Sequence, residues 1–168
     1  ITTWAPAPVG EERGSLVSQM TMGHTDFAVR YFGAEAVHVV YRSTSGAGDA
    51  GTEVSGVVFI PKGDPPEGGW PIVSVAHGTT GVTDECAPSL YPNLLGTIGT
   101  VAPFLERGMV VAVTDYEGIG TPGSHPYLDP DAAAHNVIDA VRAARNVVPS
   151  AGTRWAAIGN SQGGQAVW

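Results

Sequence analysis

The sequence has little that could bind a metal ion or form a disulfide. It contains a single cysteine, Cys86, among 168 residues, so no disulfide can form within the chain. His24 and Asp26 lie close together in sequence, but a two-residue pair without further ligands at a fixed spacing does not make a metal site. We therefore expect no metal ion and no cofactor.

Positive charge and long apolar runs are also scarce. The chain has 8 Lys and Arg against 16 Asp and Glu, a formal net charge of −8, and this field repels phosphate backbones and anionic lipid surfaces. Nucleic acid is therefore not an expected partner. No stretch approaches the roughly 18 apolar residues that span a bilayer, so we predict no transmembrane segment. A hydrophobic content of 43% predicts a globular domain with a sizeable core.

The chain begins at Ile1 and not at a methionine, which suggests that a signal peptide or a tag has been removed. Secretion is consistent with this beginning. In a cytosolic protein Cys86 would be a lone thiol without a role, whereas in a secreted protein we expect it to pair with a cysteine outside this chain.

Strand and helix patterns alternate along most of the sequence. A β-branched and aromatic run at 36–41, a turn-rich cluster at 43–51 and a second run at 54–60 predict a hairpin with a longer loop. Short apolar runs at 71–76, 109–113 and 155–158 predict further strands. The stretch 94–107 is compatible with a helix, and Asp129 followed by Pro130 predicts the start of another. Strand, helix, strand, helix and strand in this order predict a parallel sheet with helical crossovers.

A candidate nucleophile follows the last of these strands. The segment Gly159-Asn160-Ser161-Gln162-Gly163-Gly164 fits the pattern G-x-S-x-G at a strand-to-helix turn. Side chains at Gly159 and Gly163 would clash with neighbouring backbone in such a turn, which explains two glycines at this spacing. The alternative is an ordinary glycine-rich turn that holds a phosphate, but the basic residue of a phosphate loop is missing. We therefore interpret Ser161 as the nucleophile of a serine hydrolase.

Two backbone amides are candidates for an oxyanion hole. In the strand–elbow–helix arrangement the residue after the nucleophile, Gln162, donates one N–H, and the loop after an earlier strand donates the second. That loop is His77-Gly78-Thr79-Thr80-Gly81, in which we choose Thr79 as the donor and Thr80 as the next candidate. His77 is interpreted as structural and not as a base.

The general base and its acid are not evident in this sequence. In the expected fold the order is Ser, then Asp or Glu, then His, whereas every acid and histidine here precedes Ser161. Asp115 ends a strand and is excluded as the triad acid by this order. We expect His77, Thr80, Tyr116 and His125 to line the pocket, His125 without being the triad base.

Five segments together resemble the secretory lipase family of α/β hydrolases, which is found in actinobacteria and fungi; they are 76–81, 84–89, 114–123, 125–127 and 159–164. The resemblance implies a secreted enzyme that cleaves a small-molecule or lipid carboxylic ester through an acyl-enzyme on Ser161. It implies an α/β-hydrolase fold, a mostly parallel sheet with helices on both faces, present here as its N-terminal part up to the nucleophile elbow.

On this basis we predict an N-terminal extension packing on the core over 1–34 and the N-terminal half of the catalytic domain over 35–168. A further C-terminal segment or a second chain is expected to carry the triad Asp and His, a cap over the site, and a cysteine for Cys86. Three alternatives remain open: transfer of the acyl group to an alcohol or amine, a peptidase with the same nucleophile, and a non-catalytic binding module of the same fold.

Overall fold

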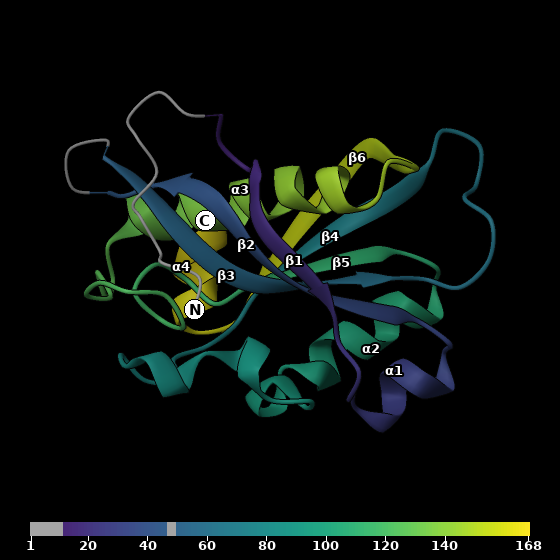
Figure 1. Ribbon diagram of the computed structural model, residues 1–168, viewed down its shortest axis with the longest axis horizontal. Helices are drawn as coiled ribbons and strands as arrows, with labels where there is room; N and C mark the ends of the chain where they lie inside the picture. Colours follow the sequence, from purple (N-terminus) through teal and green to yellow (C-terminus); the bar gives the residue numbers. More distant parts are fainter. Residues whose placement is uncertain (1–11, 47–49) are drawn as a thin grey trace.

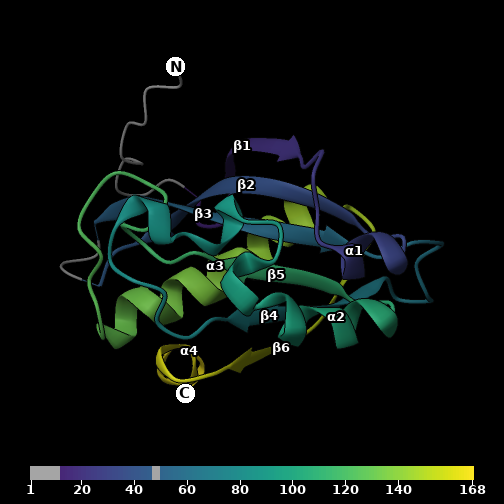
Figure 2. The same cartoon turned by 90° about the horizontal axis from the view of Figure 1, so that it is seen from below.

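A six-stranded sheet forms the centre of the computed structural model, which describes residues 12–46 and 50–168 (Figure 1). The strands lie side by side in the order β1-β2-β3-β5-β4-β6, so that β1 and β6 are the two edges (Figure 2). Their bounds are β1 Leu16–Thr21, β2 Glu35–Thr44, β3 Gly51–Ile60, β4 Trp70–Ala76, β5 Val110–Thr114 and β6 Ala151–Gly159.

The sheet combines an antiparallel half with a parallel half. The predicted hairpin is confirmed as β2 and β3, which pair antiparallel from Glu35 opposite Ile60 to Thr44 opposite Gly51. The predicted crossovers are also confirmed, because β4 pairs parallel with both β5 and β6. However, the pairings β1–β2, β2–β3 and β3–β5 are all antiparallel. Only two of the five pairings are therefore parallel, fewer than a mostly parallel sheet would have. The sheet is mixed, because strands joined by a hairpin enter it beside the crossover units.

Helices cover both faces of the sheet, as predicted. One face carries α1 (Phe27–Tyr31) and α2 (Ile98–Glu106), and the other carries α3 (Pro130–Val147) and α4 (Gln162–Val167) (Figure 1). Alternate residues of one strand enter opposite cores, since Val58 packs in the cluster under α3 and Val57 packs in the cluster under α2. Three short 3₁₀ turns join β4 to α2: η1 Asp84–Cys86, η2 Pro88–Leu90 and η3 Leu94–Gly96.

The longest helix, α3, begins where the sequence predicts. The Asp129 carboxylate accepts hydrogen bonds from the N–H groups of Asp131 and Ala132, both at 3.0 Å, and Pro130 occupies the first turn. Val137, Val141 and Ala144 are buried on the face toward the sheet. This cap and this apolar stripe together hold α3 across the strands.

The stretch before β2 contributes to the same sheet. Within it, β1 pairs with β2 as an edge strand and α1 packs near α2, although the sequence has no clean period there. Half of β1 is exposed, so few of its positions need to be apolar. Residues 1–11 of the predicted extension lie outside the described residues, and the boundary at 34/35 stays a prediction.

The order of the parallel strands determines where a site can form. Because β4 lies between β5 and β6, the chain crosses to one side of β4 through α2 and returns to the other side through α3. Loops that leave adjacent strands in this way diverge and open a crevice at the carboxyl ends. The loop after Ala76 and the turn after Gly159 meet at this crevice.

Among the described helices, none is both long and apolar enough to cross a bilayer.

Candidate active site

Ser161 lies in a tight turn between β6 and α4. Its backbone has φ 54° and ψ −118°, and the N–H of Gly163 donates to the carbonyl oxygen of Asn160 at 2.9 Å. These values are those of the first central residue of a type II′ turn, a position that favours glycine. A serine held in such a conformation costs of order 1–3 kcal/mol and persists only where its surroundings enforce it.

The neighbouring glycines enforce this conformation by close backbone packing. A Cβ atom on Gly159 would lie 1.9 Å from the carbonyl oxygen of Gly163, and one on Gly163 would lie 1.9 Å from the carbonyl oxygen of Ala76. By contrast, a Cβ atom on Gly164 would have its nearest neighbour at 3.9 Å. The start of α4 therefore rests directly on the ends of β4 and β6, as the glycine spacing in the sequence predicts.

The Ser161 side chain is on the exposed side of this turn. Within the described residues, no histidine and no carboxylate forms a hydrogen bond with its hydroxyl. In the part of the chain that the structure describes, the serine is thus presented to solvent without a base beside it.

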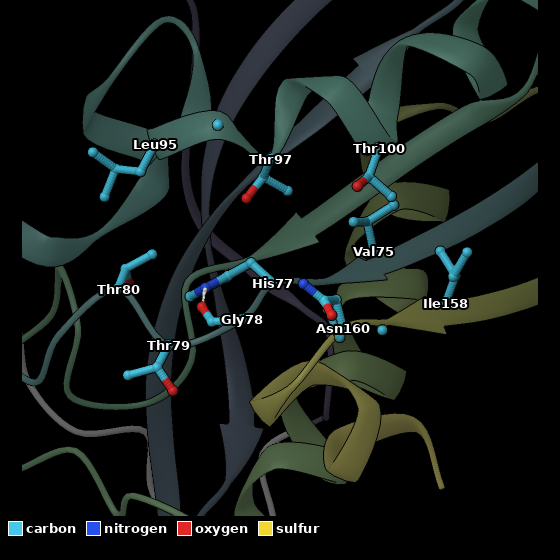
Figure 3. Close-up of a pocket in the computed structure, with 13 residues that line it drawn as sticks. Val75, His77, Gly78, Thr79, Thr80, Leu95, Thr97, Thr100, Ile158 and Asn160 are labelled. Carbon is cyan, nitrogen blue, oxygen red and sulfur yellow. Dashed lines mark hydrogen bonds between the residues drawn. The ribbon is translucent and has the colours of Figure 1, made fainter.

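The loop after β4 is anchored by His77. Burial lowers the pKa of His77, which favours its neutral form with one ring N–H. Nδ1 lies 2.6 Å from the carbonyl oxygen of Gly78 and Nε2 lies 3.4 Å from that of Asp115, so the proton belongs on Nδ1 (Figure 3). The Tyr116 hydroxyl donates to the His77 carbonyl at 2.8 Å, and burial raises the pKa of Tyr116, which keeps that donor protonated. The contacts of the His77 ring and of the His77 carbonyl therefore both anchor the loop after β4, which is a structural role.

The hydrogen bond to the Gly78 carbonyl also orients the next amide. In a trans peptide the C=O and the following N–H point in opposite directions, so the Thr79 N–H points away from the His77 ring. A Cβ atom on Gly78 would lie 3.6 Å from the Cβ of Ser161, which places this peptide close to the serine.

Two backbone amides near Ser161 have no hydrogen-bond acceptor among the described residues. Gln162 is the first residue of α4, where a helix leaves its N–H without an intrahelical acceptor. Across residues 12–46 and 50–168, neither the N–H of Gln162 nor that of Thr79 donates a hydrogen bond. The two residues chosen from the sequence as oxyanion donors therefore both carry a free N–H, and their role stays a prediction.

The side chain of Gln162 connects two loops. Its Oε1 accepts from the Thr79 hydroxyl at 3.2 Å, and its Nε2 lies 2.9 Å from Nε2 of His125. The His125 ring in turn contacts the Glu117 carbonyl through Nδ1 at 2.7 Å. Tyr116 and His125 are stacked with ring centroids 6.1 Å apart. The sequence singled out the Gln162 backbone, but nothing in it indicated this side-chain bridge.

The carboxylate of Asp115, at the end of β5, forms its hydrogen bonds away from Ser161. Its buried carboxylate accepts from the hydroxyls of Ser55 and Ser89 and from the Ser89 N–H. Burial raises the pKa of Asp115, and the hydrogen bonds from Ser55 and Ser89 oppose that rise. This acid ties β3 and η2 to β5 and does not contact Ser161.

A pocket of about 440 Å³ opens beside the elbow, between the ends of β4 and β6 and the start of α2 (Figure 3). His77 and Thr80 line it, whereas Tyr116 and His125 are not among its lining residues and lie on the side of Gln162. Sequence reasoning missed Thr97 and Thr100, which face the pocket from the same side of α2. Their spacing of three at a helix start, where such residues share a face, is the signal that could have found them. The remaining lining residues include Asn160, Ile158, Val75 and Leu95.

The described residues contain no group of three or more His, Cys, Asp and Glu side chains that could hold a metal ion. Cys86 is a free, half-buried thiol whose Sγ lies 3.2 Å from the Thr83 hydroxyl.

Residues 97–168 match the secretory lipase family. The resemblance predicted from the sequence is confirmed over this part of the chain, which includes α2, the loop with His125 and the Ser161 elbow. Among curated proteins, none matches the chain.

Solved structures similar to this one include a lipase and an esterase. Candida antarctica lipase A in its closed state superposes with a TM-score of 0.75 at 17% identity, over 92% of this chain and 37% of that one. The rice cell wall degrading esterase LipA from Xanthomonas oryzae, in a ligand-bound form, gives a TM-score of 0.70 at 23% identity, over 90% of this chain and 43% of that one. The predicted α/β-hydrolase fold is thus confirmed, and this chain spans less than half the length of either structure.

Proposed function

We propose that this chain carries the nucleophile and the oxyanion hole of a serine hydrolase that cleaves carboxylic esters. The conformation of Ser161 is the observation that carries this proposal. A serine replaces the favoured glycine at a strained turn position, and close glycine contacts keep it there with its hydroxyl exposed. Folding alone does not require a serine at this position, whereas nucleophilic catalysis does.

The chemistry follows from the groups at the elbow. A base removes the proton of the Ser161 hydroxyl while Oγ attacks the ester carbonyl carbon, and the carbonyl oxygen becomes an oxyanion. The N–H groups of Gln162 and Thr79 stabilise that oxyanion. Its collapse breaks the bond to the alcohol, which leaves with the proton from the base and leaves an acyl group on Ser161. Water then adds in the same way, releases the acid and restores the serine.

We propose that a further C-terminal segment or a second chain supplies the base, a histidine, and its carboxylate partner. Two observations support this. No described histidine contacts the Ser161 hydroxyl, and the related structures extend well beyond the part that this chain matches. His125, whose ring contacts the Gln162 side chain, uses both ring nitrogens in contacts with Glu117 and Gln162.

The pocket lined by Thr97, Thr100 and Ile158 is the candidate site for one end of a small-molecule or lipid ester, because it begins at Gly159 and Asn160, directly before the nucleophile. The match to a family of secretory lipases supports a secreted enzyme.

The test is covalent labelling of the complete protein with a fluorophosphonate, combined with hydrolysis of p-nitrophenyl esters. Ser161→Ala is expected to abolish labelling and to lower kcat on the order of 10⁶-fold. Ser150→Ala is the matched control, since Ser150 is exposed at the opposite end of β6. This variant is expected to leave the labelling and kcat unchanged. Near-native turnover in Ser161→Ala, or a label on another residue, would make the proposal wrong.

A further inference from the structure

The side chain of Gln162 is buried, with 5% of the residue exposed, and both ends of its amide are used. One end meets Thr79 in the loop after β4, and the other meets His125 in the loop after β5. Gln162 itself begins the helix after β6. A single side chain therefore joins the carboxyl ends of three neighbouring strands.

The bridge continues on both sides of Gln162 through polar groups in contact with one another. The Glu117 carbonyl can only accept, so Nδ1 of His125 donates to it, and Nε2 of the same ring lies 2.9 Å from the Gln162 NH₂ group. The Gln162 oxygen accepts the Thr79 hydroxyl, whose own oxygen lies 3.3 Å from the Tyr127 hydroxyl. Each contact along this path joins polar groups that can form a hydrogen bond, and a Gln162 replacement without an amide would break the path.

The bridge joins the two amides that the proposed function uses. An oxyanion hole works only when both N–H groups point at one position, since a misplacement of about 1 Å is enough to cost a large factor in rate. The Thr79 loop is exposed at Thr79 and rests on the elbow through this contact. The Gln162 backbone supplies one N–H, and its side chain holds the residue that supplies the other.

We propose that the Gln162 side chain is a positioning residue, which sets the distance between the two oxyanion amides by holding Thr79 and His125. This inference rests on the proposed ester hydrolysis at Ser161. It goes beyond the backbone role of Gln162, because it states that the side chain also contributes to the rate of ester hydrolysis.

A double-mutant cycle in the complete protein tests the bridge. Thr79→Val removes the hydroxyl and keeps the backbone N–H, and Gln162→Met removes the amide and keeps a similar volume. We expect each change to lower kcat per fluorophosphonate-reactive serine about three- to tenfold, with KM changed less than about twofold, since a single hydrogen bond contributes that much. The double variant is expected to lose no more than the larger single loss, because both changes break the same contact.

Two further variants separate positioning from general destabilisation. Thr79→Ser keeps the hydroxyl and is expected to retain kcat within about twofold. Thr21→Val is the matched control for Thr79→Val, because Thr21 is an exposed threonine on the opposite edge strand β1 whose hydroxyl also donates to a side chain, that of Glu35; this variant is expected to leave kcat per reactive serine unchanged. Thr79 is exposed, so Thr79→Val is expected to fold even if Gln162→Met does not.

Independent losses that multiply in the double variant would overturn the inference. So would an unchanged kcat per reactive serine in Thr79→Val, with or without a lower Tm. In both cases the wild-type protein still hydrolyses esters, and the proposed function stands. A wild-type protein that neither hydrolyses esters nor reacts with the fluorophosphonate would instead overturn the proposed function, and this inference with it.

Discussion

At the scale of single residues, glycines hold Ser161 in place. Gly159 and Gly163 differ from Gly164 in the space available for a side chain, although all three lie within six residues. A side chain on Gly159 or Gly163 would meet backbone oxygen at 1.9 Å, whereas Gly164 has space for one. The backbone cannot move away cheaply, because the Ala76 carbonyl belongs to β4, which is paired on both sides, with β5 and with β6.

This difference predicts opposite effects of the same substitution. Gly163→Ala is expected to lower the free energy of unfolding by about 1–3 kcal/mol or more and to disable Ser161, because α4 must move off β4. Gly164→Ala, its control in the same helix, is expected to be neutral or to stabilise by up to about 1 kcal/mol through helix propensity. Urea unfolding and labelling of Ser161 measure both. Equal effects of the two variants would contradict the packing described for the elbow.

At the scale of elements, α3 holds the parallel strands and carries much of the core. It packs on β2, β4 and β5, and its residue Asn136 accepts a hydrogen bond from the Tyr41 hydroxyl through its carbonyl oxygen. Its start follows the loop that carries His125 and Tyr127. The cap at Asp129 therefore supports both the helix and the end of that loop.

Asp129→Ala is expected to lower the free energy of unfolding by about 1 kcal/mol, because two N–H groups in the first turn lose their acceptor. Asp131→Ala is the control, since Asp131 is an exposed acid in the same turn whose carboxylate caps nothing. Denaturant unfolding of both variants measures the difference. If Asp131→Ala is as destabilising as Asp129→Ala, the loss reflects helix charge and not the cap.

At the scale of the whole molecule, the β6 edge of the sheet has no second strand beside it in the part of the chain that the structure describes. Within the described residues β6 pairs only with β4, and its apolar side chains Trp155 and Ile158 are 45% and 42% exposed. An apolar edge strand of this kind attracts other chains. We propose that the further segment or second chain that supplies the base packs against this edge, since no base lies beside Ser161 within residues 12–46 and 50–168.

We therefore expect residues 1–168, expressed by themselves, to hydrolyse esters at least on the order of 10⁴-fold more slowly than the complete protein, since the serine lacks its base. They are also expected to aggregate or to bind a hydrophobic dye. Ester hydrolysis, dye binding and cooperative unfolding check this, with the complete protein as the reference. A soluble, cooperatively folded and fully active fragment would contradict the expectation and make His125 the first residue to test as the base.

Local patterns account for most of what could be predicted from the sequence. The hairpin, the crossover units, the cap at Asp129 and the elbow at Ser161 depend on residues close together in the chain, and each appears where its pattern predicts. The edge strand β1 was not predicted, because a half-exposed strand that pairs on one side needs no regular apolar pattern.

The sequence by itself determined the strained serine turn and the two glycines that permit it, since their spacing of four residues is set by local backbone geometry. Only the tertiary structure decided that β4 lies between β5 and β6, and hence that the loops carrying Thr79 and His125 meet at Gln162. These residues are 83 and 37 positions from Gln162 in the chain. Contacts between residues so far apart in the sequence depend on the order of the strands in the sheet. No local sequence pattern specifies that order.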